Sequence, residues 1–382
     1  MRRTVFLPVS GRSFTVDGPG GIAMSFITIV GAGMMGSAMS GPAADNGHEV
    51  RLVGTPLDRE IIDSVRESGF HPTLRKGLPS VVRAYQVEEL DRALEGADLV
   101  IGGVSSFGVD WFSEEVLPLL RPGIPVLSVT KGLRDNPDGT LTPFPYLLAS
   151  RLPEKTRGMI PFNAIGGPCI CFELLDKRHT MVYFCGEDPT VLETIRGMLA
   201  TGYYHILTTT DVAGVEGCVA LKNAYAMGVS LAVGLADREV GDLDGEAAAA
   251  LCAPGAPDRN PVYNPQAALF AQSCLEMRRI VERMGGDGAL AGGVPGAGDL
   301  YVTIFGGRTR RLGTLLGRGI PFAEAEKILK GVTLESVAII TRVARALRAG
   351  GVNRVEFPLL FHMDAILNGG AEVDLPWDQF GC

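Results

Sequence analysis

The stretch FITIVGAGMMGS, residues 26–37, has the pattern of a buried strand that runs into a glycine-rich turn and then a helix. Its three glycines have the G-x-G-x-x-G spacing of dinucleotide-binding loops. In such a loop the first glycine permits a tight turn, the second lets the backbone approach a pyrophosphate, and the third lets helix and strand pack closely. The helix N-terminus then faces the phosphates. The stretch therefore predicts a dinucleotide site whose cofactor-binding residues are Gly31, Gly33, Met34, Met35 and Gly36.

Strand-like and helix-like segments alternate outward from this stretch as far as about residue 209. The expected strands are residues 26–33, 49–54, 81–87, 98–104, 125–130, 163–168, 180–186 and 203–209. The clearest expected helices of this region are residues 36–48, 58–68 and 109–120. Regular alternation implies right-handed crossovers and a mostly parallel sheet. The sequence therefore predicts an α/β, Rossmann-type, doubly wound N-terminal domain.

The pattern becomes helical from Asp211, a good N-cap residue, and stays helical to the end of the chain. A chain of 382 residues exceeds a usual single core, so two domains are expected. We expect a loose leader over residues 1–23, a dinucleotide-binding domain over 24–209 and an all-α substrate and catalytic domain over 210–382. The acidic and then proline-rich stretch 237–265 is interpreted as a surface insertion between two helices.

Charge and composition exclude some classes of function. The chain has a formal net charge of −8 and a pI near 5.3, whereas a nucleic-acid binder needs a basic surface. A small anionic ligand stays compatible, because a pocket can be locally positive on an acidic protein. No apolar run long enough to span a membrane is present, so no membrane span is expected.

The cysteines indicate a reducing compartment. Their number is odd and their spacing matches no disulfide framework, which is typical of free thiols. They are Cys169, Cys171, Cys185, Cys218, Cys252, Cys274 and Cys382. The C-x-C pair at 169 and 171 has no second cysteine or histidine cluster nearby, so no metal site is expected. The expected location is the cytoplasm.

The identity of the dinucleotide depends on the end of the second expected strand. An acidic residue there would hydrogen-bond the adenosine ribose and favour NAD over NADP. The segment RLVGTPLDRE, residues 51–60, has Gly54 and Thr55 where the acid is often found, and Asp58 lies further along. Either NAD or NADP is therefore expected. A nicotinamide is favoured over a flavin, because a hydride carrier can come and go beside a proton-donating lysine.

That lysine lies in GVEGCVALKNAYAMG, residues 214–228, a helix-like stretch of small and apolar residues. On a helix Lys222 shares its stripe with the nearly apolar set Val215, Cys218, Val219, Tyr225, Ala226 and Val229. One interpretation is a lysine with a buried stem and a charged head in water. The other is a desolvated lysine, its pKa lowered toward working pH, that exchanges a proton with a substrate oxygen. The dinucleotide loop in the same chain favours the second.

Several motifs together resemble those of the NAD(P)-dependent glycerol-3-phosphate dehydrogenases, within the broader 6-phosphogluconate-dehydrogenase-like group. The resemblance runs from about residue 26 to 350 and includes GAGMMG, SVTKGL, GGP, TTTDVAGVEGCVALKN, GAGDLYVTIFGGRTRRLGTLLGRG and GVTLES. The D-x-x-G-x-E-x-x-x-x-L-K-N and G-x-G-D-L…G-G-R strings are the specific part. The resemblance implies interconversion of glycerol 3-phosphate and dihydroxyacetone phosphate at an active site between two domains, and it is compatible with a homodimer.

The resemblance also implies roles for individual residues. The implied catalytic residues are Lys222, Lys131 and Asp299. The implied substrate-binding residues are Asn223, Thr303, Arg308 and Thr309. Besides the glycine loop, the residues implied to contact the dinucleotide are Arg308 and Glu335. In this scheme Lys222 exchanges the proton, Asp299 orients it, and Arg308 grips the substrate phosphate.

The chain departs from the family pattern on the substrate side. Thr309 stands where the family has an asparagine, and Gln272 stands at the usual arginine of the following helix. Residues 169–171 are Cys-Ile-Cys rather than small, and the insertion 237–265 lies close in sequence to the lysine helix. The hydride and proton chemistry is expected to be kept, with glycerol 3-phosphate as first choice. The open alternatives are a paralogue acting on another small anionic hydroxy or keto compound, and a non-catalytic dinucleotide-sensing protein.

Overall fold

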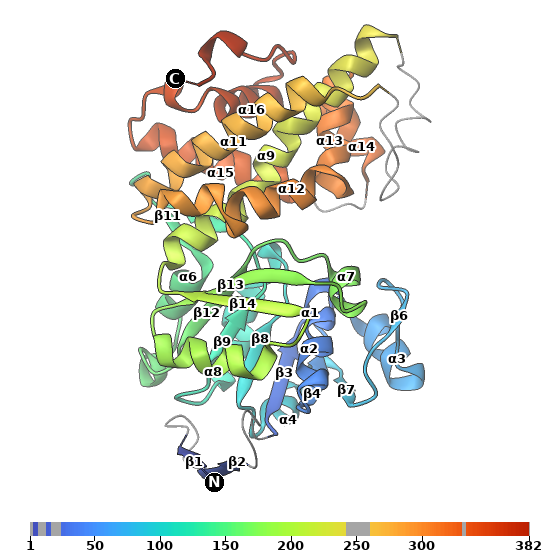
Figure 1. The fold of residues 1–382 in the computed structure, drawn as a ribbon, viewed down its shortest axis with the longest axis vertical. Helices are drawn as coiled ribbons and strands as arrows, with labels where there is room; N and C mark the ends of the chain where they lie inside the picture. The colour runs from blue at the N-terminus through green and yellow to red at the C-terminus, as the bar shows by residue number, and fades with distance from the viewer. Residues whose placement is uncertain (1–2, 7–12, 17–23, 242–259, 331–333, 382) are drawn as a thin grey trace. The chain divides into compact units, whose positions relative to one another are not determined.

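The computed structural model describes residues 3–6, 13–16, 24–241, 260–330 and 334–381 (Figure 1). The chain forms two compact units. The first contains Met1–Lys131 and Phe144–Val212, and the second contains Gly132–Pro143 and Ala213–Cys382. Each unit has a hydrophobic core of its own and is described by itself below.

The first unit is built on a sheet whose described strands number eight, in the order β14-β13-β12-β9-β8-β3-β4-β7. Their bounds are β3 (Phe26–Val30), β4 (Glu49–Val53), β7 (Val82–Tyr85), β8 (Leu99–Gly102), β9 (Val126–Ser128), β12 (Phe162–Gly166), β13 (Thr180–Gly186) and β14 (Tyr204–Thr209). All neighbours are parallel except β12 and β13. The strand order reverses between β3 and β8, which is where doubly wound sheets bind ligands. The predicted doubly wound architecture is confirmed.

Helices cover both faces of this sheet (Figure 1). They are α1 (Met34–Ala38), α2 (Ser40–Asp45), α3 (Arg59–Ser68), α4 (Leu90–Leu94), α5 (Val109–Trp111), α6 (Phe144–Ser150), α7 (Cys171–Leu175) and α8 (Pro189–Leu199). The central strand serves two cores, because successive residues point to opposite faces. Ile27 and Ile29 join one core and Val30 joins the other.

Two expected helices differ from the prediction. The helix after the glycine loop is divided at Met39 into α1 and α2. The helix expected over 109–120 is α helical only in α5 and continues as a π turn at Phe112–Val116 and a 3-10 turn at Leu117–Leu119. Pro118 explains the end of regular helix at the 3-10 turn, since proline has no N–H to donate to the preceding turn.

Two short antiparallel ribbons accompany the sheet. β1 (Arg3–Phe6) pairs with β2 (Ser13–Val16), and β5 (Phe70–His71) pairs with β6 (Lys76–Gly77). The first ribbon lies in the segment 1–23 that was expected to be loose, and the rest of that segment lies outside the described residues. In the second ribbon, His71 contacts the backbone of the glycine loop at Ala32.

The second unit is helical, as predicted for the C-terminal half. Its helices are α9 (Val212–Glu239), α11 (Tyr263–Arg283), α12 (Asp299–Ile304), α13 (Gly307–Gly317), α14 (Phe322–Ile328), α15 (Glu335–Ala349) and α16 (Pro358–Gly369). A hairpin of β10 (Leu133–Asp135) and β11 (Leu141–Pro143) joins it. Leu133 is fully buried in the helical core, and the Arg345 side chain pairs with Asp135 at 3.0 Å. The sequence-based ranges 24–209 and 210–382 do not include this exchange.

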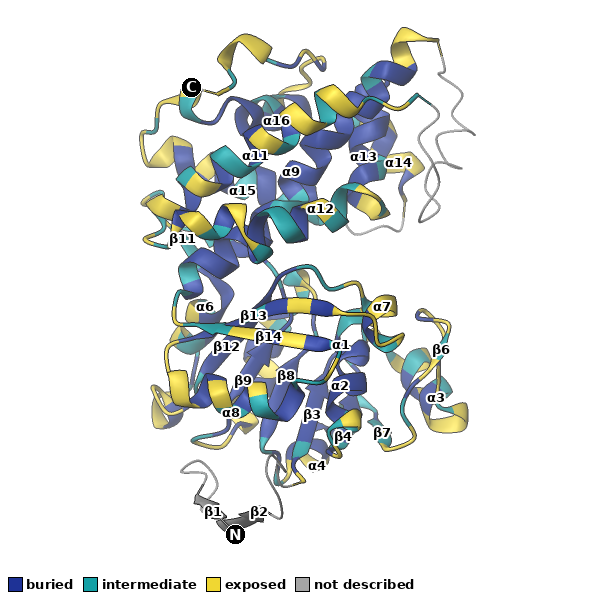
Figure 2. Ribbon diagram, viewed as in Figure 1, coloured by how far each residue is buried: buried dark blue, intermediate teal, exposed yellow. Residues whose placement is uncertain are grey.

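The helix α9 forms the centre of the second unit. Figure 2 shows it buried along most of its length. By length and composition α9 could cross a membrane, but 83% of its most apolar window is buried inside the protein, as in the core helix of a globular unit. It crosses α13 at backbone contact, because a Cβ at Gly313 or Gly317 would overlap main-chain oxygens of Met227 or Leu231.

The insertion predicted at 237–265 is described only at its ends, and residues 242–259 lie outside the described residues. At the first end, Asp237 forms an ion pair with Arg318 at 2.8 Å, and each side chain is only 1% exposed. At the second end, Asn260 donates to the other oxygen of Asp237 at 3.0 Å. One buried carboxylate at the first end therefore contacts the second end and also Arg318, the residue that directly follows α13.

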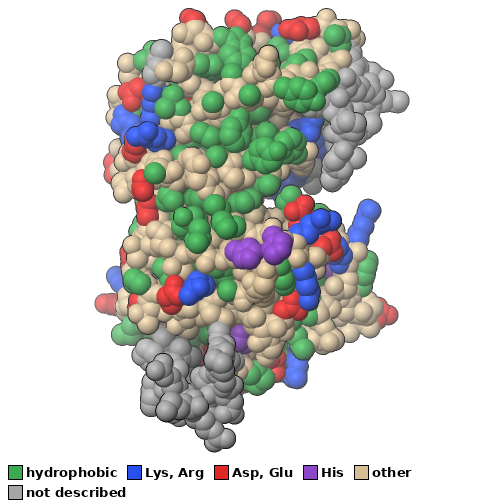
Figure 3. All heavy atoms as spheres, in the orientation of Figure 1, with side chains coloured by type: hydrophobic (Ala, Val, Ile, Leu, Met, Phe, Trp, Pro, Cys, Tyr) green, Lys and Arg blue, Asp and Glu red, His purple; other side chains and the backbone are tan. Residues whose placement is uncertain are grey.

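The face drawn in Figure 3 shows Lys and Arg interspersed with Asp and Glu. No broad basic surface is visible on that face.

Candidate active site

The glycine loop of the first unit is held against the end of β8 at backbone distance. Gly31 has a φ of +109°, and a Cβ there would lie 2.7 Å from the carbonyl carbon of Gly103. A Cβ at Gly36 would lie 2.6 Å from the carbonyl oxygen of Gly31. Both positions therefore require glycine for reasons of turn geometry and packing. Gly103 is a third member of this contact that the sequence reasoning did not single out, although the Gly-Gly pair after β8 offered a signal.

Gly33 behaves differently from its neighbours. Its backbone is extended, with φ −65° and ψ 167°, which any residue can adopt. A Cβ there would meet its nearest atom, the Gly103 oxygen, at an ordinary 3.7 Å. Packing within the described protein thus does not require this glycine. This open position is compatible with the pyrophosphate role expected for the second glycine. Met34, 37% exposed, begins the following helix.

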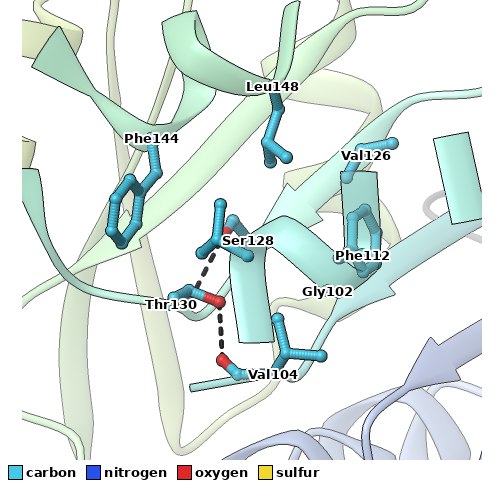
Figure 4. A pocket seen from close by; sticks show the side chains of 9 residues that line it. Gly102, Val104, Phe112, Val126, Ser128, Thr130, Phe144 and Leu148 are labelled. Atoms are coloured by element: carbon cyan, nitrogen blue, oxygen red, sulfur yellow. Dashed lines mark hydrogen bonds between the residues drawn. The ribbon is translucent and has the colours of Figure 1, made fainter. Parts of the chain in front are cut away.

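Lys131 follows β9 in the first unit and is partly buried. The turn before it is fixed by Thr130, whose hydroxyl donates to the Val104 carbonyl at 2.7 Å and whose N–H donates to the Ser128 hydroxyl at 3.1 Å (Figure 4). Val104, Ser128 and Thr130 are among the residues that line an apolar cavity of about 10 Å³, which is about the volume of one water molecule. That cavity is too small for a substrate.

Lys222 and Asp299 form the centre of the candidate site in the second unit. The Lys222 ammonium donates to Oδ1 of Asp299 at 2.5 Å. The lysine side chain is 13% exposed and the aspartate side chain is fully buried. The apolar stripe predicted around Lys222 is also present, since Val215, Cys218, Val219, Tyr225, Ala226 and Val229 are all fully buried. Lys222 is thus a largely buried lysine with a fully buried carboxylate partner.

Asn223 lies beside this pair on α9 and contacts a second expected site residue. Its Nδ2 donates to Oε2 of Glu335 at 3.1 Å. Glu335 is the first residue of α15 and is partly buried. A residue expected on the substrate side and one expected on the dinucleotide side are therefore joined by a hydrogen bond.

The segment after Asp299 positions the other expected residues. The hydroxyl of Thr303 donates to the backbone carbonyl of Asp299 at 2.7 Å, within α12. Arg308 is exposed in the first turn of α13, whereas Thr309 is buried. Arg310, which the sequence reasoning did not single out, is 9% exposed and donates to the Phe305 carbonyl at 3.0 Å. This bond connects the end of α12 to the start of α13.

Gln272 lies in a separate buried cluster rather than with these residues. Its Nε2 donates to Glu276 at 2.9 Å, and its Oε1 accepts from the N–H of Gly381 at 2.9 Å. The same Glu276 carboxylate accepts from the Tyr225 hydroxyl at 3.1 Å and from the first N–H groups of α16. Gln272 was expected on the substrate side, but its contacts are with Glu276 and with the backbone of Gly381. It supports the carboxylate that caps α16.

The described residues offer no obvious metal centre. Within the described ranges, no three His, Cys, Asp or Glu side chains are grouped so that they could hold a metal ion. Cys169 and Cys171 flank the start of α7 and are partly buried, and burial raises the pKa of the Cys171 thiol.

Two family models match the chain over most of its length. Residues 26–191 match the NAD-dependent glycerol-3-phosphate dehydrogenase N-terminus, and residues 211–377 match the C-terminus of the same family. Among similar proteins is an NADP(+)-dependent glycerol-3-phosphate dehydrogenase of Archaeoglobus fulgidus, 31% identical over 91% of this chain and 96% of the relative. A glycerol-3-phosphate dehydrogenase [NAD(P)+] of Myxococcus xanthus is 28% identical over 80% of this chain and 84% of the relative.

Solved structures share the fold. A glycerol-3-phosphate dehydrogenase from Coxiella burnetii has a TM-score of 0.73 at 24% identity, covering 91% of this chain and 96% of the other. One from Plasmodium falciparum has a TM-score of 0.72 at 20% identity, covering 91% and 93%. At these identities the likeness concerns the fold, and it agrees with the sheet and helical units described above.

Proposed function

Because this chain belongs to the NAD-dependent glycerol-3-phosphate dehydrogenase family, we propose that it interconverts glycerol 3-phosphate and dihydroxyacetone phosphate. The chain is an NAD(P)-dependent oxidoreductase acting on a CH–OH group. A bound nicotinamide would supply or accept the hydride at the central carbon of the substrate. The protein must then bind both molecules and supply or remove one proton at the substrate oxygen.

The Lys222–Asp299 ion pair carries this proposal. During reduction the Lys222 ammonium donates a proton to the carbonyl oxygen, and during oxidation the neutral amine takes the hydroxyl proton. The carboxylate of Asp299 is fully buried, and its Oδ1 lies 2.5 Å from the Lys222 ammonium nitrogen. It is proposed to hold the ammonium in one orientation. A sensing protein without catalysis would not need a buried carboxylate aimed at a lysine, so the catalytic reading is favoured.

The start of α13 is the proposed anion clamp. Arg308 is exposed there, and a helix N-terminus also favours negative charge. A charge-assisted contact to phosphate contributes about 1.5–3 kcal/mol. Asn223, Thr303 and Thr309 are proposed to bind the rest of the substrate, and Lys131 is proposed as the second lysine of the active site.

The first unit is proposed to hold the dinucleotide and the second to supply the proton. The glycine loop fits such a ligand, because its second glycine leaves room that the protein itself does not use. The residues proposed to bind NAD or NADP are Gly31, Gly33, Met34, Met35, Gly36, Arg308 and Glu335. The proposed cellular location is the cytoplasm, which suits the free thiols of Cys171 and Cys274. The expected homodimer stays a prediction that sedimentation can test.

A spectrophotometric screen tests the proposed function. NADH and NADPH are each mixed with dihydroxyacetone phosphate and with other small anionic ketones, and nicotinamide oxidation is followed. Turnover of dihydroxyacetone phosphate with the highest kcat/KM is expected. Turnover of another ketone alone would instead select the paralogue alternative, and nucleotide binding without any turnover would select the sensing alternative.

A further inference from the structure

Ala32, between the first two glycines of the loop, has both of its backbone polar groups bound by side chains. Its N–H donates to Oδ2 of Asp58 at 3.2 Å, and its carbonyl oxygen lies 2.9 Å from Nε2 of His71. Ala32 and His71 are fully buried. Neither side chain belongs to the glycine motif. The loop is therefore held from outside by two residues that follow β4 in the sequence.

Asp58 is itself firmly placed. The same Oδ2 accepts from the N–H and the hydroxyl of Thr55, at 2.8 and 2.7 Å. Asp58 directly precedes α3, yet its side chain makes no capping bond to that helix. The carboxylate of Asp58 is turned toward the glycine loop instead, so this acid is already engaged within the protein.

His71 can make its contacts in one protonation state only. A carbonyl oxygen only accepts, so Nε2 carries a proton and donates it to Ala32. The N–H of Leu74 donates to Nδ1 at 3.2 Å, so Nδ1 offers its lone pair. A second proton, on Nδ1, would point at the Leu74 N–H. Because the ring is fully buried, a lost bond there would leave a polar group without water.

We propose that His71 is a positioning residue of the dinucleotide site, and that its neutral imidazole keeps the loop in the conformation that receives the pyrophosphate. The inference rests on the proposed function, because it takes the glycine loop to be the nucleotide site. Its consequence is a nucleotide affinity that falls on acidification. The fall comes from loop geometry and not from the proton transfer at Lys222.

The groups around His71 allow a neutral ring at ordinary pH. Burial lowers the pKa of His71, against smaller opposing effects of the Ala32 carbonyl and the negative charge of Asp58. Lys76 is its partner across the β5–β6 ribbon, and the Lys76 ammonium pairs with Asp176. The imidazole is thus neutral near pH 7 and becomes charged at a lower pH than an ordinary histidine.

Direct nucleotide titration tests this inference. NADH and NADPH binding is followed by fluorescence at about pH 7.5 and about pH 5, the second value well below the ordinary histidine pKa because burial lowers the pKa of His71. The wild type should bind more weakly at the lower pH. His71→Ala should bind about tenfold more weakly at the higher pH, roughly the effect of one hydrogen bond, and should lose the pH dependence. His71→Gln can donate to Ala32 without titrating, so it should keep wild-type affinity at both values.

His48 offers a matched control in the same unit. His48 directly precedes β4 and is also buried, and burial also lowers its pKa. Its Nδ1 accepts from the N–H of Ser25 at 3.1 Å. His48→Ala should lower thermal stability and leave nucleotide affinity unchanged. An equal loss in this variant, unchanged affinity in His71→Ala, or a wild-type pH dependence in His71→Gln overturns the inference. Absence of nucleotide binding by the wild type would overturn the proposed function as well.

Discussion

The ammonium nitrogen of Lys222 lies 2.5 Å from Oδ1 of Asp299, although the two residues are 77 positions apart. The carboxylate is fully buried, while the lysine side chain keeps 13% of its exposure. Of the two groups, the ammonium is therefore the one that can reach a substrate. In the mechanism that we propose, the aspartate acts through the lysine by fixing the direction of its ammonium group.

Replacing the lysine should separate chemistry from binding. Lys222→Ala is expected to lower kcat by about 10²- to 10⁴-fold, the usual contribution of a positioned general acid. Dinucleotide binding should change little, since the glycine loop is untouched. Steady-state kinetics together with nucleotide titration checks both statements. A variant with wild-type kcat would remove Lys222 from the proton transfer.

Neutralising the aspartate tests orientation rather than proton transfer. Asp299→Asn should lower kcat by roughly tenfold to a hundredfold, because misplacing a reacting group by about 1 Å has that effect. Asp237→Asn is the matched control, since it breaks another buried ion pair on the same helix, α9. Both variants should lose thermal stability, by up to about 3–5 kcal/mol. Only Asp299→Asn should lose kcat, and an equal loss in both would indicate general destabilisation.

Two glycines of the same loop should respond in opposite ways. Gly33→Ala should leave the melting temperature nearly unchanged, since its Cβ meets nothing closer than 3.7 Å, but should weaken dinucleotide binding. Gly31→Ala should destabilise the protein by about 1–3 kcal/mol, because its Cβ would lie 2.7 Å from backbone at a φ of +109°. Thermal melts with and without NADPH measure both effects. Wild-type nucleotide affinity in Gly33→Ala would place the pyrophosphate elsewhere.

Removing the proposed anion clamp should act mainly on substrate affinity. Arg308→Ala is expected to raise KM for dihydroxyacetone phosphate by about 10- to 100-fold, the value of one charge-assisted contact. Arg278→Ala removes an exposed arginine of α11 that pairs with Glu282 and serves as the control. An unchanged KM in Arg308→Ala would show that another group binds the phosphate.

Glu276 should give the stability of the second unit a pH dependence. Burial raises the pKa of Glu276 to about 7, against four hydrogen bonds that favour its charged form. Its folded pKa lies above the unfolded value, so the folded state holds the extra proton between about pH 4.5 and about pH 7. The free energy of unfolding should fall as pH rises through this window. Glu276→Gln should flatten that slope, whereas Glu282→Gln, on the exposed face of α11, should not.

The fold was largely predictable, because strand–helix alternation and the glycine fingerprint are local signals. The central strand and its turn were found within a few residues, and the change to a helical half was placed at Asp211, next to the observed start of α9. The hairpin of residues 132–143 was not assigned to the helical unit. Its two strands have only three residues each. So short a pattern does not show whether a strand joins the large sheet or packs against α15.

The site was predictable only where a motif existed. Lys222 stood out as a cation on an apolar stripe, but pairing it with Asp299 depended on family resemblance, since no periodicity links residues 77 apart. Gln272 was expected beside the substrate, yet it contacts Glu276. The sequence pattern of a helix shows which face is buried, but not whether that face lines the core or the active site. His71 gave no signal at all. Its role comes from a single contact to the backbone of another segment.

The crossing of α9 and α13 has a consequence for how substrate preference can change. The two helices meet main chain to main chain at Gly313 and Gly317, so their close spacing depends on the absence of a Cβ at these two positions. Lys222 lies on one of these helices, and Arg308 lies in the first turn of the other. Substitutions at other positions can alter what each group touches, whereas a larger residue at either glycine would push the two helices apart. If Lys222 and Arg308 are the proton donor and the anion clamp that we propose, a longer or shorter substrate would be accommodated by moving a loop, while the glycine contact keeps the two helices at the same spacing.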